Sequence, residues 1–319
     1  MIYSYATKTP NSHACKITGS QYRGSAMAIQ IQKRDFSNAG VVHPEIVTPT
    51  VVVIPCFNEE ERLPANEFLD FIDQTSGISF LFVNDGSTDQ TAERLANLCE
   101  QRPKVFSAIS LDQNSGKAEA VRQGLLHATS TGANFVGYWD ADLATPLDAI
   151  EDFLRIANRF DDVSVIFGSR RMLLGHRIKR TFFRRCVSQI CSSLAYQALQ
   201  VRVGDTQCGA KLFRNSHSLK LSLRSQFTAG WLFDIELFSR MSKQIGAKPN
   251  AFFELPLAEW EEVAGSKVSS KAIFKAGISM LGLIAENRLG LTLRRKKTAA
   301  TPTASVISTN PKLLGKFAT

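Results

Sequence analysis

Three short runs of apolar and β-branched residues constrain the fold of this 319-residue chain more than any other feature. They cover residues 50–55, 80–83 and 135–139. Each has the length and composition of a buried parallel strand, and segments with helical periodicity lie between them. Strands that alternate with helices predict an α/β fold with a mostly parallel, doubly wound, Rossmann-like sheet and right-handed crossovers.

Two helix starts are expected after the second and third runs. Ser87 stands three residues before Gln90, the spacing of a capping box. Thr145 precedes Pro146, and proline favours the first turn of a helix. We therefore expect one helix to be capped at Ser87 and another at Thr145.

Acidic residues follow all three apolar runs. Glu59 comes after the first run, Asp85 after the second, and Asp140 and Asp142 after the third. Ligands of such sheets bind beyond the carboxyl ends of the strands, where these carboxylates would repel one another unless a cation or hydrogen-bond donors lay between them. Oxygen ligands on a short loop suit Mg²⁺ or Mn²⁺, so we expect Asp140 and Asp142 to bind one of these ions.

Two of the residues near these strand ends have an ordinary interpretation beside a functional one. Asp85, followed by Gly86, fits a plain turn as well as an acceptor for a base or ribose. Lys117, preceded by Gly116, fits an ordinary loop as well as an anion site at the start of a helix.

Five motifs occur in order along the chain: Val53-Ile54-Pro55-Cys56-Phe57-Asn58-Glu59, Asn84-Asp85-Gly86-Ser87, Gly116-Lys117, Asp140-Ala141-Asp142-Leu143 and Gly168-Ser169-Arg170. Together they resemble the family 2 glycosyltransferases with the GT-A fold, and among these the dolichyl-phosphate sugar synthases. The resemblance covers roughly Thr50 to Lys267. Three further segments resemble the β-glucosyltransferase branch, which uses UDP-glucose: Asp205-Thr206-Gln207-Cys208-Gly209, Trp231-Leu232-Phe233-Asp234-Ile235-Glu236, and Trp260-Glu261-Glu262 with Gly265-Ser266-Lys267.

The resemblance implies a role for each matching residue. The residues that would line the nucleoside pocket are Pro55, Phe57, Glu59 and Asp85. Asp140 and Asp142 would hold the metal and the donor diphosphate, while Arg170 and Lys267 would face phosphate groups. Two positions depart from the pattern: Asn84 stands where an aspartate is common, and Ala144 replaces a glutamine that completes the metal shell in mannosyl relatives.

The chemistry of the proposed transfer favours cations over a catalytic base at the acceptor site. A metal on Asp140 and Asp142 neutralises the departing nucleoside diphosphate, which makes Asp142 a catalytic residue. A phosphate monoester is largely a dianion at neutral pH and attacks unaided. Arg170, also expected to be catalytic, opens a basic stretch with interleaved apolar residues, in which Arg180 and Arg184 are expected to bind the acceptor phosphate. This stretch also fits a solvated surface.

The two ends of the chain differ in composition from the middle. Residues 1–47 and 298–319 are expected to be disordered tails around a glycosyltransferase domain at 48–267. Residues 268–297 have an amphipathic pattern that ends in a polybasic cluster, which predicts an in-plane helix on an anionic membrane, or a helix packed on the domain itself. With no apolar run long enough to span a bilayer, a peripheral position on the cytoplasmic face is expected. The scattered cysteines favour reduced thiols.

Two rival functions fit parts of the sequence. A glycosyltransferase with a hydroxyl acceptor would use Asp234 as its base, although Asp234 also fits a role in orienting the sugar or pairing with arginines. A non-catalytic basic membrane-binding protein would explain the formal net charge of +9, but not acids at three strand ends. Nucleic-acid binding is not expected, because no module for it is recognisable.

Overall fold

Alternate side chains of β1 (Thr50–Cys56) point to opposite faces of a sheet, and both faces are buried. Val51 and Val53 belong to one apolar cluster, and Val52 and Ile54 belong to another. A strand with both faces covered needs helices on either side, which is why its sequence reads as one continuous apolar run. The computed structural model describes residues 48–171, 175, 177–179, 192–193, 196–197, 203–246, 248–261, 277–279, 281–282, 284–285 and 304–308.

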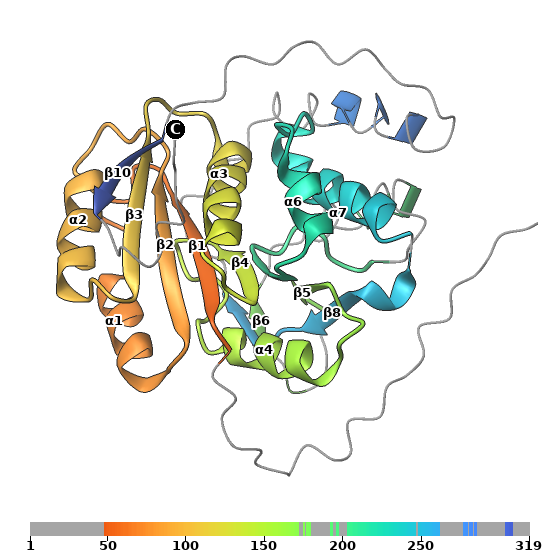
Figure 1. Ribbon diagram of the computed structural model, residues 1–319, viewed down its shortest axis with the longest axis horizontal. Helices are drawn as coiled ribbons and strands as arrows, with labels where there is room; N and C mark the ends of the chain where they lie inside the picture. Colours follow the sequence, from red (N-terminus) through yellow and green to blue (C-terminus); the bar gives the residue numbers. More distant parts are fainter. Residues whose placement is uncertain are drawn as a thin grey trace, which may run out of the picture. The chain divides into compact units, whose positions relative to one another are not determined.

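Among the described residues, the main sheet has eight strands in the order β10-β3-β2-β1-β4-β7-β5-β8. Figure 1 shows β3, β2 and β1 side by side in this sheet. Around β1, the strands β2 (Ile78–Asn84), β3 (Phe106–Leu111) and β4 (Phe135–Trp139) pair in parallel. These strands include all three apolar runs singled out in the sequence. The parallel α/β arrangement predicted for this half of the molecule is therefore confirmed.

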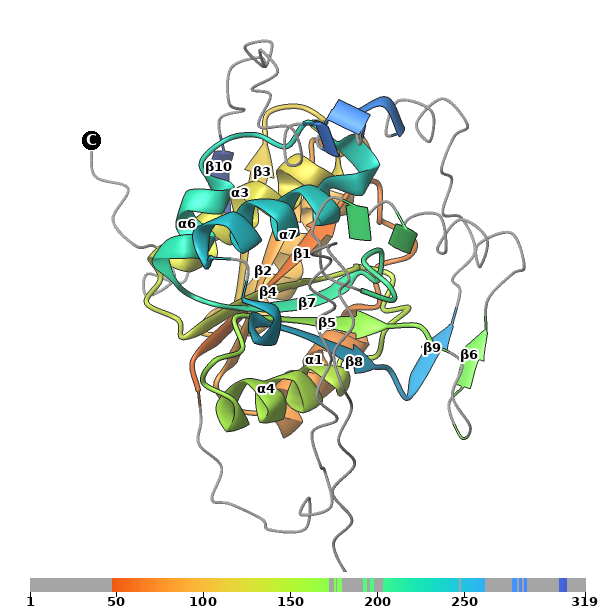
Figure 2. The same cartoon turned by 90° about the vertical axis from the view of Figure 1, so that its right-hand side faces the viewer.

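The other half of the sheet contains a reversed strand, which the sequence patterns did not indicate. Strand β7 (Ala210–Arg214) runs antiparallel between β4 and β5 (Val165–Ser169), and β8 (Phe252–Pro256) pairs in parallel with β5 (Figure 2). At the far edge, β10 (Ala304–Ser308) pairs antiparallel with β3. Residues 304–308 thus form a strand where we expected an unstructured tail.

Helices cover both faces of the sheet. The apolar cluster that contains Val51 and Val53 includes residues of α3 (Lys117–Ser130), α6 (His217–Leu223) and α7 (Phe233–Gln244). The opposite cluster includes residues of α1 (Ala65–Gln74), α2 (Thr91–Gln101) and α4 (Ala149–Arg159). The described residues also include the 3₁₀ turns η1 (Gly230–Leu232) and η2 (Pro249–Ala251). The sheet is doubly wound, as predicted.

Helices α2 and α4 begin later than predicted, at Thr91 and Ala149, and the expected side-chain caps do not form. The Ser87 hydroxyl instead accepts a hydrogen bond from the backbone N–H of Asn58, at 3.0 Å. The Thr145 hydroxyl lies 3.8 Å from the sulfur of Cys208. Both side chains are therefore used to join loops instead of starting helices.

A small second sheet lies beside the loop that follows β4. Strand β6 (Arg177–Lys179) pairs in parallel with β9 (Glu259–Glu261), and Ile178 is opposite Trp260. The backbone N–H of Glu261 donates to the carbonyl of Ala144, at 3.2 Å. This bond fixes the small sheet to the loop that carries Asp140 and Asp142.

Three of the predicted segments lie wholly or mostly outside the described residues. These are residues 1–47, most of the proposed membrane helix at 268–297, and the tail at 298–319 apart from β10. Of that helix, the described residues between 277 and 285 are helical, and Ile284 packs against the core. Within the part of the chain that the structure describes, no helix is both long and apolar enough to cross a bilayer.

Candidate active site

The acidic loops after β1, β2 and β4 lie at one edge of the sheet, because these strands are parallel neighbours in register. The backbone N–H of Asp85 donates to the carbonyl of Cys56, at 2.8 Å, so the first two loops are joined where their strands end. Glu59 lies close enough to Asp142 for their charges to interact. The structure thus brings together the acids predicted to share one site.

Asp140 and Asp142 lie on a tight loop whose position depends on β7. The backbone N–H of Asp140 donates to the carbonyl of Gly209, at 3.0 Å, and the Asp140 carboxylate lies against Gly209. Asp142 accepts a hydrogen bond from the backbone N–H of Ala144, at 3.1 Å. Burial, and after it the charge of Asp140, raises the pKa of Asp142. A nearby cation would relieve this crowding of two carboxylates.

Lys117, the first residue of α3, provides a cation at this edge. Its ammonium group forms an ion pair with the Asp140 carboxylate. The protein atoms around the ammonium lower the pKa of Lys117, but the carboxylates of Asp140, Asp234 and Asp142 raise it above its usual value. Lys117 therefore remains charged among three acids.

The loop before α3 is held in place by Asp85. Its two carboxylate oxygens accept hydrogen bonds from the backbone N–H groups of Ser115 and Gly116, both at 2.8 Å. A Cβ atom on Gly86 would lie 2.4 Å from the backbone nitrogen of Asn114, so the two loops touch closely. Burial raises the pKa of Asp85, against the effect of its N–H donors. Asp85 thus fixes the loop that leads to Lys117.

The two carboxylate oxygens of Glu59 differ in their hydrogen bonding. Its Oε1 atom accepts from Arg62, at 2.8 Å, whereas Oε2 is buried and has no hydrogen-bond partner among the described residues. Burial is the main cause that raises the pKa of Glu59. Pro55 lies at the end of β1, and the neighbouring Phe57 side chain is 41% exposed. An unpaired buried acceptor beside an exposed ring suits a ligand with both donors and an aromatic face.

The donor set fits a hard divalent ion that keeps part of its shell for other ligands. Asp140 and Asp142 supply carboxylate oxygens, the ligand type that Mg²⁺ and Mn²⁺ prefer. In the part of the chain described here, no group of three or more His, Cys, Asp and Glu side chains is placed to hold a metal. Two protein carboxylates leave room for water and phosphate oxygens.

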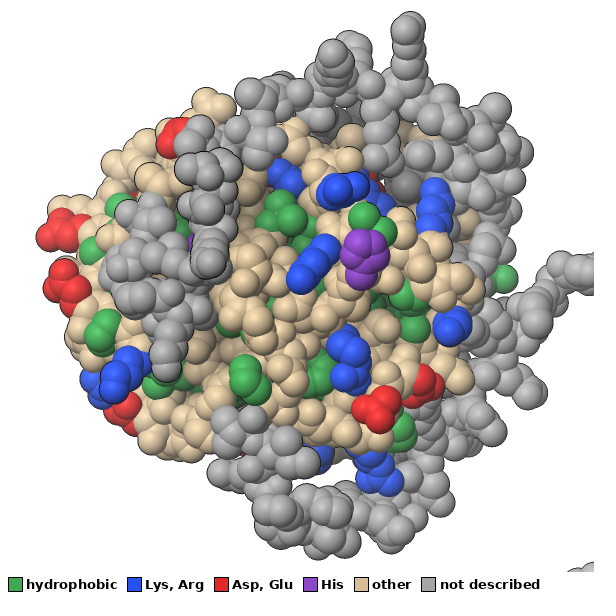
Figure 3. All heavy atoms as spheres, in the orientation of Figure 1, with side chains coloured by type: hydrophobic (Ala, Val, Ile, Leu, Met, Phe, Trp, Pro, Cys, Tyr) green, Lys and Arg blue, Asp and Glu red, His purple; other side chains and the backbone are tan. Residues whose placement is uncertain are grey.

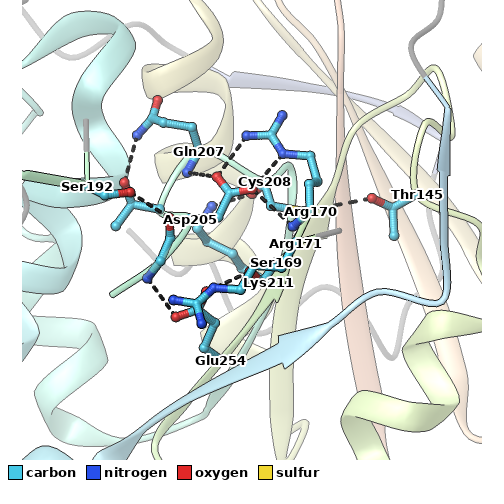
Figure 4. A network of polar contacts seen from close by, with 12 residues as sticks. Thr145, Ser169, Arg170, Arg171, Ser192, Asp205, Gln207, Cys208, Lys211 and Glu254 are labelled. Atoms are coloured by element: carbon cyan, nitrogen blue, oxygen red, sulfur yellow. Dashed lines mark hydrogen bonds and ion pairs between the residues drawn. The ribbon is translucent and has the colours of Figure 1, made fainter. Parts of the chain in front are cut away.

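Arg170, at the end of β5, already has an anionic partner. Its guanidinium group forms two hydrogen bonds with Asp205, at 2.7 and 2.8 Å (Figure 4). The same group lies over the ring of Trp260. Burial lowers the pKa of Arg170, but the pairing with Asp205 prevails and raises it. The expected phosphate contacts of Arg180, Arg184 and Lys267 stay predictions, because these residues lie outside the described residues.

A second carboxylate supports the segment before β7. Glu254 accepts hydrogen bonds from the Ser169 hydroxyl, at 2.6 Å, and from the backbone N–H of Gly204, at 2.7 Å, and it forms an ion pair with Arg171 (Figure 4). These contacts join the ends of β5 and β8 to the loop that leads to Gly209. We did not predict a role for Glu254, because nothing in its short strand marks it as more than a surface acid.

Asp234 lies at the start of α7, and one of its carboxylate oxygens has two partners. Its Oδ1 atom accepts from the Tyr138 hydroxyl and lies 3.1 Å from the Nζ atom of Lys211. Burial raises the pKa of Asp234, while Lys211 and Tyr138 limit the rise. Lys211 was missed in the sequence, although a lysine inside the strand Ala210-Lys211-Leu212-Phe213 is a detectable signal of a buried charge.

Comparison with known proteins shows the family to which this chain belongs. The family model described as Glycosyl transferase family 2 matches residues 51–221. The chain belongs to this family. A dolichyl-phosphate beta-glucosyltransferase of Trichomonas vaginalis is 30% identical over 275 residues, covering 82% of this chain and 81% of its own. The dolichyl-phosphate beta-glucosyltransferase of Saccharomyces cerevisiae is 32% identical over 238 residues, 68% of each chain.

Two solved structures share the fold described above. Glucosyl-3-phosphoglycerate synthase from Mycobacterium tuberculosis, in complex with Mn²⁺ and UDP-glucose, superposes with a TM-score of 0.56 at 17% identity, covering 81% of this chain and 86% of its own. Mannosyl-3-phosphoglycerate synthase from Rubrobacter xylanophilus gives a TM-score of 0.52 at 15% identity, covering 79% of each chain. The predicted GT-A fold is confirmed.

Proposed function

We propose that this protein transfers glucose from UDP-glucose to a dolichyl-type polyprenyl phosphate, with inversion at the anomeric carbon. The observation that carries the proposal is the match, over most of the chain, with relatives named dolichyl-phosphate beta-glucosyltransferase. The acids gathered at the strand ends support it, because they supply what a nucleotide-sugar donor with a metal ion requires.

The donor would bind along the edge where β1, β2 and β4 end. Asp140 and Asp142 would hold Mg²⁺ or Mn²⁺, which supplies positive charge for the diphosphate that leaves. Lys117 adds a second cation at the same place. Glu59, Pro55, Phe57 and Asp85 remain our proposed nucleoside pocket, and the unpaired Oε2 atom of Glu59 supports this choice.

The proposed phosphate acceptor does not need a general base. A phosphate dianion forms the new bond to the anomeric carbon while the bond to UDP breaks, and UDP leaves with the electron pair, so no proton has to be removed. Asp234 would be the base for a hydroxyl acceptor, and Tyr138 and Lys211 engage its Oδ1 atom. A phosphate acceptor needs no such base, so in this proposal Asp234 has no proton to accept.

Cations for the acceptor phosphate would come from the segments beyond the small sheet. Strands β6 and β9 are parallel and end side by side at Lys179 and Glu261. In the sequence, Arg180 and Arg184 follow the first of these strands and Lys267 follows the second. Arg170, paired with Asp205, would act in this proposal from the base of that region.

Membrane contact is proposed for the amphipathic segment 268–297, on the cytoplasmic face. In its described part, Ile278 and Leu281 are 57% and 65% exposed, while Ile284 packs against the core. The described part of the face in Figure 3 carries dispersed Lys, Arg and His side chains together with Asp and Glu side chains. Exposed apolar residues, followed later in the sequence by Arg294-Arg295-Lys296-Lys297, suit an anionic bilayer.

Transfer to lipid is the experiment that tests the function. The full chain, incubated with UDP-glucose, Mn²⁺ or Mg²⁺ and dolichyl phosphate, is expected to form a glucose-labelled lipid. Asp142→Asn is expected to abolish the product, and the matched variant Asp152→Asn, in an exposed pair with Arg155, is expected to retain it. Glucose transfer only to a free hydroxyl, with none to the lipid phosphate, contradicts the proposal.

A further inference from the structure

Lys211 is a charged side chain that protein encloses completely. It lies on β7 directly opposite Tyr138 on β4, and its exposed fraction is 0%. Its ammonium nitrogen lies 3.1 Å from Asp234, 5.1 Å from the centre of the Tyr138 ring and 5.8 Å from that of Phe238. Neutralising Asp234 does not by itself explain this lysine, because well-packed apolar side chains can replace a buried ion pair without loss of stability.

A second contact of Lys211 is to the backbone. Its ammonium group donates a hydrogen bond to the carbonyl of Cys208, a fully buried residue that lies three positions earlier, in the turn that leads into β7. The lysine side chain therefore folds back along its own chain and fastens this turn to the strand. A charged donor makes a stronger hydrogen bond than a neutral one, so the contact suits a fastening role.

Two other contacts hold the beginning of the same turn. The backbone N–H of Gly204 donates to Glu254, at 2.7 Å, and Asp205 is paired with Arg170 (Figure 4). The buried ammonium group secures the end of the turn. A turn that is fixed at both ends has few other conformations open to it.

The residue after Cys208 is Gly209, and it lies directly against Asp140. The Gly209 carbonyl accepts the hydrogen bond from the backbone N–H of Asp140, at 3.0 Å. The Asp140 carboxylate in turn forms the ion pair with Lys117. Each step from the Lys211 ammonium group to Asp140 is therefore a hydrogen bond or a peptide bond.

We propose that Lys211 is a positioning residue. Its ammonium group, fixed by Asp234, holds the Cys208 carbonyl and thereby the neighbouring Gly209 carbonyl that orients Asp140. The ion pair with Asp234 then serves to keep the ammonium group in place. The use of Asp140 at a donor site rests on the proposed function, whereas the placement of Asp140 beside Gly209 does not.

Hydrogen exchange at the Asp140 amide, measured by NMR on protein without ligand, reports this placement. The Gly209 carbonyl protects that amide for as long as the turn stays in position. An internal reference lies beyond the other end of the β4–β7 strand pair, where the backbone N–H of Asn215 donates to the carbonyl of Asn134, at 2.9 Å. Comparing the two amides separates a local change from a general loss of stability.

The variant to measure combines Lys211→Met with Asp234→Asn, which removes both buried charges and leaves neither uncompensated. Its Asp140 amide is expected to exchange about 10-fold faster, relative to the Asn215 amide, than in the unchanged protein. If Lys211 only neutralises Asp234, the ratio stays the same. An unchanged ratio therefore overturns the proposal.

A matched control removes another buried ion pair, that of Arg122 and Glu119 on α3, 2.6 Å apart. Arg122→Met with Glu119→Gln is expected to change the exchange of the Asp140 and Asn215 amides by the same factor, because a lower global stability acts on both. A selective change at Asp140 in this control as well overturns the assignment to Lys211.

If the Lys211 variant does not fold, the unchanged protein decides. With isotope-labelled lysine and cysteine, the Lys211 ammonium group is expected to show an NMR coupling to the Cys208 carbonyl carbon across their hydrogen bond. The absence of this coupling overturns the proposal. Glucose transfer enters none of these measurements, so a failure of the proposed function and a failure of this inference are distinguishable.

Discussion

Asp140 keeps its position because Gly209 has no side chain. A Cβ atom on Gly209 would lie 2.0 Å from the Oδ2 atom of Asp140, far inside any contact distance. The clash is with a carboxylate and not with backbone, so the side chain of Asp140 must rotate away while the loop stays. The glycine and the aspartate therefore form one functional unit.

Gly209→Ala is expected to lower the rate of glucose transfer about 100-fold, because displacing a group at the reacting site by about 1 Å has effects of this size. The rate is measured with the lipid acceptor at saturating UDP-glucose. Thermal unfolding serves as the control and is expected to change little. An alanine variant with the full rate contradicts the view that Gly209 determines where Asp140 lies.

Glu59 predicts a pH dependence of stability. Its raised pKa means that the folded protein holds this proton at pH values where the unfolded chain, with an ordinary glutamic acid pKa of about 4.3, has lost it. Because the folded state binds more protons in that window, this group makes the folded state less stable as pH rises through it.

Urea unfolding of donor-free protein at pH values from about 4 upward measures the effect. Relative to the unchanged protein, Glu59→Gln is expected to gain stability as pH rises through the window, since glutamine does not titrate. A constant difference between the two proteins across these pH values contradicts a raised pKa of Glu59 in the folded state.

The sequence correctly indicated the position of residues that directly follow a strand, such as Asp140 and Asp142 after β4. It was uninformative for residues whose task is set by partners distant in sequence. Lys211 forms an ion pair with Asp234, and Arg170 forms one with Asp205. Such pairings depend on the order of strands across the sheet, which no local pattern contains.

Helix α3 lies unusually close to the sheet. A Cβ atom on Gly124 would lie 2.3 Å from one methyl group of Val53 and 2.9 Å from a methyl group of Val83. The same helix begins with Lys117, so its distance from β1 and β2 also sets the height of the ammonium group above the strand ends. Packing in the core and geometry at the site are thus connected through one rigid helix.

Gly124→Ala is expected to destabilise the fold by about 1–3 kcal/mol, the usual cost of forcing an extra methyl group into a packed core. Adding Val53→Ala removes the Val53 methyl groups that the new Cβ meets and leaves only that of Val83, so the double variant is expected to be more stable than the sum of the two single effects predicts. Chemical denaturation of the four proteins measures this coupling. Strict additivity contradicts the close contact.

At the level of elements, periodicity predicted the central strands well and the helix starts poorly. The three apolar runs correspond to β1, β2 and β4 because burial on both faces leaves a continuous signal. The expected caps at Ser87 and Thr145 failed because both hydroxyls bind groups from other loops. Strand β10 is short and pairs at an edge, so its sequence carried little signal.

At the scale of the whole molecule, ligand binding and folding are linked, since the strand ends carry more negative charge than their neighbours neutralise. UDP with Mn²⁺ at about 100 times its dissociation constant is expected to stabilise the folded protein by about 2.7 kcal/mol. A thermal shift that EDTA reverses is the expected observation, and Asp142→Asn is expected to show none. An equal shift in the variant contradicts metal binding at Asp142.

The reversed strand β7 also limits how this protein can be divided. Residues 50–139 contain the parallel strands β1 to β4 and look like a self-sufficient nucleotide-binding half. The carbonyl of Gly209, however, accepts the hydrogen bond from the backbone N–H of Asp140, and β7 itself pairs with β4. A fragment that stops before residue 209 is therefore expected to keep its parallel sheet but not to hold Asp140 in position. For the same reason, a chimaera that exchanges the donor-binding half between relatives would have to include β7.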